Sequence, residues 1–416
     1  MPEDFSQLVR TEKRHIWHPF TPMDPWCDDA HEPLMLVSGK GCWLRDQHGR
    51  DYIDGNSSIW TNIHGHSHPT ILAFIRSQLE RVAHTSFLGF THAPAAQLAH
   101  ELVHLMPESG LNRVFYSDNG STAIEAAVRM AFQYHRQTGD HLRNTILAFE
   151  NGYHGDTLGA ASLGGLGLFK GVANDFGYKV VRVSRAEQLE KLNASEIAAA
   201  IIEPLIQGAA GMRLWPPGLL KQLREWCSAS GVLLIADEVM TGFGRTGKLF
   251  ACQHEDVVPD FLCLAKGLTG GYLPLAVTMT TDCIFDAFRG DPSRAFYYGH
   301  SYTANQLGCA AALGNLQVFR DEQTMLHLAS KVARFGELAA TLSGVADARV
   351  CGMIAGIELS GPVGLGAKVC LAAREYGLLT RPIGNVIVLM PPLCVSLLEL
   401  ETMFAALQRA IDTALA

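Results

Sequence analysis

The sequence has no long hydrophobic run, no closely spaced cysteines and fewer basic than acidic residues. No segment of the 416 residues approaches the ~18 consecutive apolar residues that a membrane helix requires. With 33 basic and 41 acidic residues, the net charge of −8 disfavours a nucleic-acid-binding surface. The ten cysteines lack the short spacings of zinc sites, and the acidic N-terminus lacks a secretory signal pattern. These absences predict a cytoplasmic protein with free thiols.

The middle of the chain alternates strand-like and helix-like patterns. Apolar residues make up 48% of the sequence, which is enough for a large core. Strand-like runs are expected at 114–116, 145–149, 198–203, 231–236 and 261–265, and helices at 71–84, 95–106, from 121, and at 219–230. This alternation predicts an α/β fold in which helices cover both faces of a mostly parallel sheet.

The two ends of the chain differ from this middle part. Residues 40–54 have the pattern of a hairpin, and the tail mixes helix and strand before a final helix with a Ser396/Glu399 capping box. We therefore expect residues 71–309 to form a large domain. Residues 1–70 and 310–416 are expected to join into a smaller α+β domain. The sequence shows no internal repeat and no low-complexity tract.

Two residues of opposite charge follow two of the predicted strands. Asp237 ends the apolar run 231–236, and Lys266 follows the run 261–265. A charge at the end of a buried strand is costly unless it has a partner or a chemical task. An ion pair would satisfy both residues. Alternatively, a lysine amine that condenses with an aldehyde and a carboxylate that keeps a pyridine protonated are the groups that pyridoxal phosphate chemistry requires.

A possible anion site precedes the helix expected from residue 121. Residues 117–122 read Ser-Asp-Asn-Gly-Ser-Thr, a strand end, a tight turn and a helix start. Ser121 or Thr122 is expected to cap this helix, whose free N–H groups would face any anion placed there. On its own this pattern describes an ordinary helix start. Beside Asp237 and Lys266 it becomes a candidate phosphate cup.

Segments 237–247 and 266–271 closely resemble the signature of the class III aminotransferases, which are fold-type I pyridoxal phosphate (PLP) enzymes. The resemblance implies that Lys266 anchors PLP and moves the proton, and that Asp237 keeps the pyridinium charged. It implies that Tyr153 and Val239 pack on the two faces of the ring, with Tyr153 among the catalytic residues. The cofactor-binding set implied by the resemblance is Gly120, Ser121, Thr122, Tyr153, His154, Glu203, Asp237, Val239, Lys266 and Ser301.

The resemblance also implies a homodimer with active sites at its interface. Residues 299–305 read Gly-His-Ser-Tyr-Thr-Ala-Asn, which fits the segment that supplies a phosphate contact across such an interface. Ser301 would be the donor, and Gly299 would lie beside the substrate.

Three passages, 14–23, 57–60 and 381–392, resemble one subgroup of the class, the 8-amino-7-oxononanoate aminotransferases of biotin synthesis. The resemblance extends from about residue 12 to residue 410. It implies transfer of an amino group to 8-amino-7-oxononanoate, with S-adenosylmethionine as the usual donor. Arg381 would bind the acceptor's carboxylate. The implied substrate-binding set is Phe20, Ile59, Trp60, Tyr153, Lys266, Gly299 and Arg381.

Three departures from this subgroup bear on the amino donor. Phe20 stands where well-known members have tyrosine, Ile59 replaces the first residue of a tryptophan pair, and Val388 replaces another tyrosine. Because these positions are expected near the substrates, lysine stays open as the donor. Another ω-amino-acid transaminase of the class is the main alternative. Gln207-Gly208-Ala209 disfavours ornithine and γ-aminobutyrate enzymes, which often have glutamate at the third position.

Other classes of protein are less well supported. His64, His66 and His68 alternate as ligands on one face of a strand would, which suggests zinc, but no HExxH motif accompanies them. The class III resemblance implies instead that this Gly-His-x-His-Pro passage is a turn before a helix. The glycine-rich segment 163–167 lacks the strand–GxGxxG–helix context of a dehydrogenase. A PLP-binding protein without activity stays open as an alternative, but it would need a reason to keep Lys266, Asp237, Tyr153 and the phosphate cup together.

Overall fold

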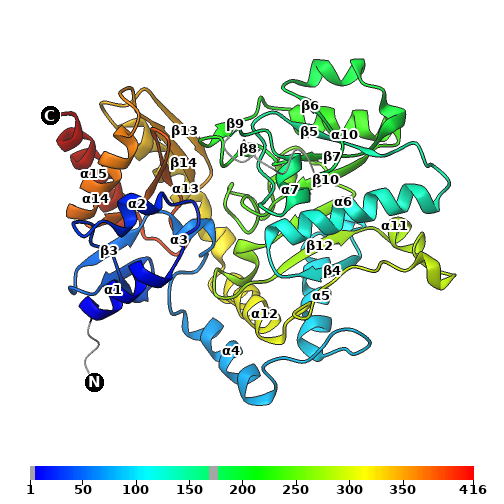
Figure 1. Ribbon diagram of the computed structural model, residues 1–416, viewed down its shortest axis with the longest axis horizontal. Coiled ribbons are helices and arrows are strands. Elements are labelled where there is room, and N and C mark those ends of the chain that lie inside the picture. Colours follow the sequence, from blue (N-terminus) through cyan, green and yellow to red (C-terminus); the bar gives the residue numbers. More distant parts are fainter. Residues whose placement is uncertain (1–4, 168–176) are drawn as a thin grey trace.

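The computed structural model describes residues 5–167 and 177–416. It consists of a large part around a seven-stranded sheet and a smaller part formed by both ends of the chain (Figure 1). Residues 1–4, on which part of the N-terminal signal prediction rests, lie outside the described residues. Among the helices that are described, none is both long and apolar enough to cross a membrane.

The seven-stranded sheet is mostly parallel, as the sequence predicted. Its strands in spatial order are β4 (Arg113–Ser117), β12 (Ala276–Thr280), β11 (Phe261–Leu264), β10 (Leu233–Asp237), β7 (Ile197–Ile202), β5 (Thr145–Phe149) and β6 (Val180–Val183). Strand β12 runs opposite to the other six strands, so its pairings with β4 and β11 are antiparallel. The helices of this part are α5 (Ala93–His104), α6 (Gly120–Gln137), α7 (Leu158–Leu163), α10 (Leu219–Ser230) and α11 (Asp282–Asp286).

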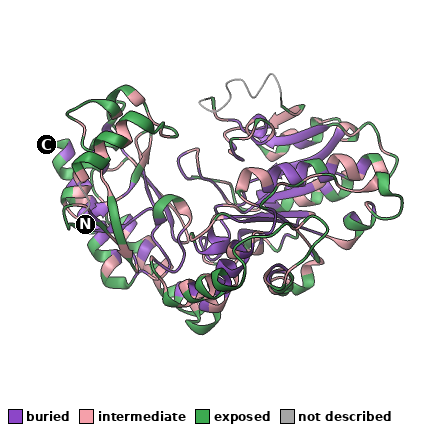
Figure 2. Cartoon of the chain, turned by 60° about the horizontal axis from the view of Figure 1, so that its bottom comes forward, coloured by how far each residue is buried: buried purple, intermediate pink, exposed green. Residues whose placement is uncertain are grey.

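Both faces of this sheet are covered, because successive strand residues point to opposite sides. In β5, Ile146 and Ala148 pack in one apolar cluster with residues of α6 and α7. Leu147 and Phe149 pack in another cluster with residues of α5 and α10. Figure 2 shows the strands buried between these helical layers. The continuous apolar runs of the sequence therefore reflect burial on both faces.

The smaller part joins segments from both ends of the chain. One sheet consists of β1 (Leu36–Lys40), β2 (Trp43–Asp46), β3 (Asp51–Asp54) and β15 (Leu378–Leu379); the other consists of β13 (Asp347–Cys351), β14 (Ile354–Glu358), β17 (Val386–Leu389) and β16 (Arg381–Ile383). Its helices are α1 (Phe5–His15), α2 (Met23–Cys27), α3 (Ser57–Trp60), α13 (Thr324–Ala340), α14 (Leu365–Glu375) and α15 (Leu397–Leu415). Because β15 pairs with β3, the C-terminal stretch completes the sheet that the N-terminal hairpin begins. The domain boundaries at residues 70 and 310 stay a prediction.

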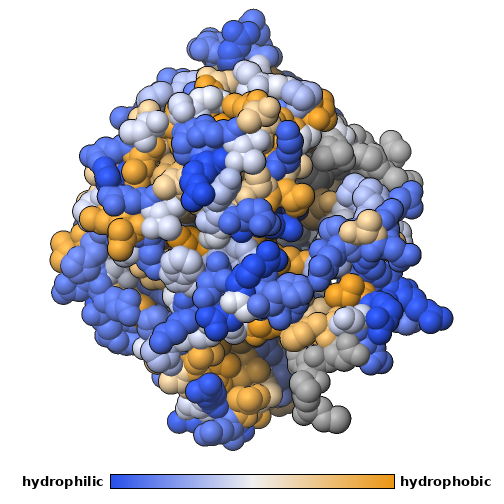
Figure 3. Space-filling view, turned by 90° about the vertical axis from the view of Figure 1, so that its left-hand side faces the viewer, coloured by the Kyte–Doolittle hydropathy of each residue, from blue (hydrophilic) through white to orange (hydrophobic). Residues whose placement is uncertain are grey.

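Two helices connect these parts. Helices α4 (Pro69–Arg81) and α12 (Gln306–Asp321) pack against each other, in the lower middle of Figure 1. The expected capping box of the last helix is present: Ser396 Oγ accepts from Glu399 N, and the Glu399 carboxylate accepts from Ser396 N. The molecular surface on the side of the smaller part, which faces the viewer in Figure 3, mixes hydrophilic and apolar residues.

The segment with His64, His66 and His68 is a turn before a helix, as the class III resemblance implied, and not the strand that a zinc site would need. The His68 side chain caps α4. The predicted cap of α6 was partly wrong: the N-cap is Asn119, whose side chain accepts from Thr122 N, and Thr122 Oγ1 accepts from Asn119 N to complete a capping box. Asn119 precedes the first helical residue, so its oxygen is the one placed to accept from the free N–H groups.

Candidate active site

Asp237 and Lys266 lie at the same edge of the large sheet. Asp237 is the last residue of β10, and Lys266 follows β11 by two positions. The two strands are parallel neighbours, as the spacing predicted, so their carboxyl ends meet. In open α/β sheets, ligands bind outside these ends.

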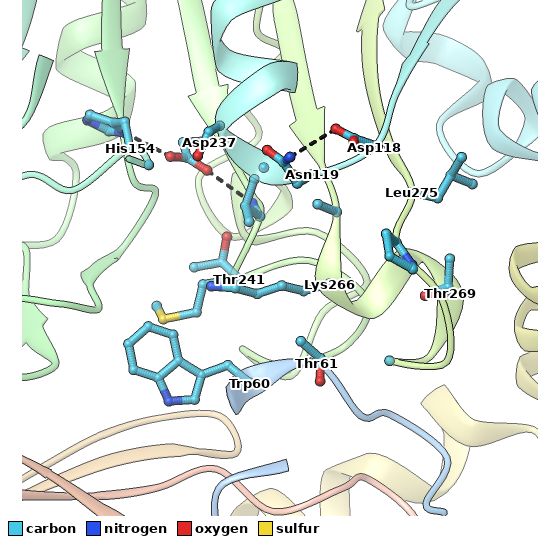
Figure 4. A pocket seen from close by; sticks show the side chains of 18 of the residues that line it. Trp60, Thr61, Asp118, Asn119, His154, Asp237, Thr241, Lys266, Thr269 and Leu275 are labelled. Atoms are coloured by element: carbon cyan, nitrogen blue, oxygen red, sulfur yellow. Dashed lines mark hydrogen bonds and ion pairs between the residues drawn. The ribbon is translucent and has the colours of Figure 1, made fainter. Parts of the chain in front are cut away.

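The Asp237 carboxylate is held in place from two sides. One oxygen is 2.7 Å from His154 Nδ1, and the other accepts from the backbone N–H of Val239 at 3.1 Å. Asp237 and His154 are both buried, with 5% and 4% of their surface exposed. The carboxylate is thereby oriented at the cavity wall with a defined partner (Figure 4).

The Lys266 amine extends into the cavity toward Trp60 (Figure 4), with Nζ 4.7 Å from the centre of the Trp60 ring. The Lys266 backbone has φ +42°, a left-handed conformation that costs a non-glycine residue on the order of 1 kcal/mol or more. Burial lowers the pKa of this amine to about 8, although the negative charges of Asp237 and Glu203 oppose the shift. About a tenth of the amine is therefore unprotonated at pH 7, far more than for a lysine with an ordinary pKa. The unprotonated amine is the form that attacks a carbonyl carbon.

Glu203 connects two loops that border the cavity. One of its carboxylate oxygens accepts from Tyr153 N at 3.1 Å, and the other accepts from Gly208 N at 2.9 Å. Burial raises the pKa of Glu203 to about 7, and the charge of Asp237 adds to this effect. The role of Glu203 visible here is to hold the loops of Tyr153 and Gly208 at a fixed distance.

The N-terminus of α6 closes one end of the cavity. Gly120 leaves no room for a side chain, since a Cβ there would lie 2.7 Å from Val239 Cγ1. Ser121 Oγ accepts from Asp156 N at 3.1 Å, which ties the helix start to the loop after Tyr153. Backbone N–H groups at a helix start favour an anion.

These residues line one cavity of about 440 Å³. Of the residues predicted from the sequence, it brings together Trp60, Gly120, Ser121, Tyr153, His154, Glu203, Asp237, Val239 and Lys266. An amine, a buried carboxylate and a helix N-terminus fit the aldehyde, ring nitrogen and phosphate of PLP respectively. The donor set therefore suits this cofactor.

Other predicted residues lie outside the cavity lining of a single chain. Phe20 and Ile59 are exposed, with 64% and 42% of their surface accessible. Ser301 and Arg381 are also exposed, and Arg381 begins β16. The remaining predicted residues that do not line the cavity are Thr122 and Gly299.

Several lining residues were absent from the predicted set. Met240 and Thr241 follow Asp237 in the chain, and the loop 271–275 forms another wall. Asp118 and Asn119 lie at the cup, within a motif that the sequence had singled out. The nearness of Met240, Thr241, Asp118 and Asn119 in the sequence to Asp237 or to the cup motif could have predicted that they line the cavity. An apolar residue such as Met240, however, is more typical of the protein core.

The geometry does not support the zinc protein or the dehydrogenase. Among the described residues, no three histidine, cysteine, aspartate or glutamate side chains are placed to hold a metal ion. Residues 163–167 begin with the last residue of α7, so a helix and not a strand precedes the glycines. The glycine-rich segment therefore has no dinucleotide-binding geometry.

Comparison with known proteins agrees with the geometry. The adenosylmethionine-8-amino-7-oxononanoate aminotransferase of Nitratidesulfovibrio vulgaris is 44% identical, covering 98% of this chain and 82% of that protein. The crystal structure of the enzyme of that name from Methanocaldococcus jannaschii has a TM-score of 0.95 and 39% identity over 99% of both chains. A PLP-bound amine transaminase from an uncultivated Pseudomonas species has a TM-score of 0.88 and 32% identity, covering 96% of this chain and 99% of that one.

These structures share the fold-type I architecture predicted from the sequence. Residues 27–411 match the aminotransferase class III family, which is nearly the whole chain. The resemblance of the segments around Asp237 and Lys266 is thus confirmed, and the chain belongs to the class III aminotransferases.

Proposed function

We propose that the protein transfers an amino group to 8-amino-7-oxononanoate and forms 7,8-diaminononanoate in biotin synthesis. The observation that carries this proposal is the full-length similarity to adenosylmethionine-8-amino-7-oxononanoate aminotransferases. The positions of Asp237 and Lys266 at the ends of adjacent parallel strands support it. PLP, when bound, supplies a carbonyl carbon that takes up the amino group and a ring that accepts the electrons of the broken C–H bond. The ten unpaired cysteines suit a cytoplasmic location.

The residues of the chain have separate tasks in this reaction. Asp237 holds a proton on the ring nitrogen, because a nearby anion stabilises the charged form. His154 keeps the Asp237 carboxylate aimed at that nitrogen through the 2.7 Å contact. With PLP bound, Lys266 Nζ would take the proton from the donor's Cα and return it to the reacting carbon of the cofactor. Tyr153 and Val239 confine the ring, and the N-terminus of α6 binds the phosphate.

The apolar chain of the acceptor requires an apolar wall, which Trp60 supplies. Trp60 packs against a buried cluster that includes Met390 and Val388. Arg381 lies opposite Val388 in the ladder between β16 and β17, so its guanidinium belongs to the strand next to this wall. We assign the acceptor's carboxylate to Arg381, and the outer part of the apolar wall to Phe20 and Ile59.

The amino donor is tested by a half-reaction. S-adenosylmethionine is added to the PLP-loaded enzyme without acceptor, and the cofactor absorbance is followed. We expect the absorbance band of PLP attached to Lys266 to disappear and to return when 8-amino-7-oxononanoate is added.

If S-adenosylmethionine leaves the band unchanged while lysine removes it, the donor is lysine. A band that neither donor changes, but that ω-amino acids or simple amines remove, would contradict the biotin-pathway assignment.

We further propose a homodimer in which Ser301 binds the phosphate of the neighbouring site. Ser301 is exposed and does not line the cavity of its own chain. If Ser301 acts across the interface, a mixed dimer of Lys266→Ala and Ser301→Ala chains has one site with both residues intact. We expect the mixture to recover cofactor affinity and activity that Ser301→Ala alone lacks, to at most about half the wild-type activity per dimer.

The measurement is a titration of PLP into the remixed chains, with separately dialysed homodimers as the control. Mixed dimers that bind the cofactor no better than Ser301→Ala alone would place Ser301 outside the neighbouring site.

A further inference from the structure

Met240 is a cavity residue with no assigned task. It stands three residues after Asp237, is 7% exposed, and lines the cavity with Trp60 and Lys266. It reaches the cavity from the turn after β10, whereas Trp60 comes from α3. We propose that Met240 determines how wide a group the substrate can carry next to its reacting carbon, an inference that rests on the proposed transamination.

Gly208 shows how closely this wall is packed. A Cβ on Gly208 would lie 2.4 Å from Met240 Sδ, 3.0 Å from Met240 Cε and 3.3 Å from Trp60 Cζ3. Met240 and Trp60 therefore meet over a position that has no side chain of its own. The backbone N–H of Gly208 donates to Glu203, which fixes this position relative to the Tyr153 loop. The Met240 thioether occupies the space that a side chain at position 208 would otherwise fill.

The wall behind Met240 leaves it no room to withdraw. Met240 and Trp60 pack in a cluster whose other buried members are Ile206, Met212, Ile354, Val388 and Met390. These five residues are at most 1% exposed. In a close-packed interior, a displaced side chain needs a void to enter, so moving Met240 toward these buried residues would require them to repack. Met240 can therefore move only on its cavity side, where its flexible thioether meets the substrate.

Two substitutions are expected to change the cavity in opposite directions. Met240→Ala removes the thioether and widens the space beside Trp60. Gly208→Ala places a methyl group against Met240 Sδ and pushes the thioether into the cavity; Gly208 does not need a positive φ, so its backbone tolerates alanine. In the double variant the new methyl group fills part of the space that the shortened side chain vacates.

The experiment compares kcat/KM for 8-amino-7-oxononanoate with that for its analogue methylated at C6, next to the reacting carbonyl. Met240→Ala should raise the ratio of branched to straight acceptor by about tenfold or more, the usual effect of one methyl group in a hydrophobic pocket. Gly208→Ala should lower the ratio, and the double variant should return toward wild type. Met212→Ala is the matched control, since Met212 belongs to the same cluster but does not line the cavity.

A second pair of substrates separates this inference from the proposed function. The rates with 3-methyl-2-aminobutane and 2-aminobutane are compared through the cofactor absorbance, which needs no biotin-pathway acceptor. If the wild type does not use 8-amino-7-oxononanoate, the proposed substrate is wrong, and the amine pair alone decides the role of Met240. Met240→Leu, expected to act in the same direction with a smaller effect, replaces the alanine variant if that variant does not fold.

The inference is overturned if the ratio of branched to straight substrate stays at the wild-type value in both Met240→Ala and Gly208→Ala at full cofactor occupancy. A Met240→Ala enzyme that turns over neither branched substrate overturns it as well.

Discussion

Lys266→Ala is expected to bind PLP without covalent attachment and to lose turnover by about 10⁴-fold, the upper end of the usual effect of losing a group that transfers a proton. The amine is the cationic group that reaches the cavity between Asp237 and Trp60, and its lowered pKa prepares it for attack on a carbonyl. The measurement is steady-state diaminononanoate formation by the purified variant, with cofactor content determined separately.

Lys248→Ala is the control for this variant. Lys248 is exposed and donates to the backbone carbonyl of Gln253, so its loss should leave the rate unchanged. Steady-state activity retained by Lys266→Ala would remove the basis of the assignment.

Asp237→Asn is expected to keep the fold and to slow turnover by on the order of 10²–10³-fold, the usual cost of losing one well-placed electrostatic group in an active site. The amide has nearly the same shape and can still contact His154, but it cannot hold a proton on the ring nitrogen by charge. The measurement is the rate of the donor half-reaction at full cofactor occupancy. Asp282→Asn, at an exposed ion pair with Arg113, is the control.

The same variant has a second, pH-dependent readout. In the wild-type apoenzyme, capture of PLP by Lys266 should accelerate as the pH rises through about 8, because the unprotonated amine is the nucleophile. The charge of Asp237 favours the ammonium form and so raises the pKa of Lys266. Removing that charge should move the capture profile to lower pH. A normal half-reaction rate with an unshifted profile would contradict the role of Asp237.

The sequence predicted those parts of the site that depend on local pattern. Asp237 and Lys266 could be found because each ends an apolar run, and parallel neighbours bring their ends together. The helix start at residues 117–122 was recognisable for the same reason, but its cap was misassigned. Asn119, Ser121 and Thr122 are all capping residue types, and only the position of Asn119 before the first helical residue decides between them.

The parts that could not be predicted depend on contacts between distant segments. Met240 has the composition of a core residue, and only its meeting with Gly208 and Trp60 reveals its place at the cavity. Ser301 and Arg381 lie outside the lining of a single chain, so their roles stay predictions.

The most direct test of the central claim is to locate the covalently held cofactor. Borohydride reduction of the PLP-loaded enzyme, followed by proteolysis and mass spectrometry, identifies the lysine that carries it. We predict that the modification lies on the peptide with Lys266 and that it disappears when the donor is added before reduction. A modification on any other lysine, or none at all, would contradict the assignment of this cavity as the active site.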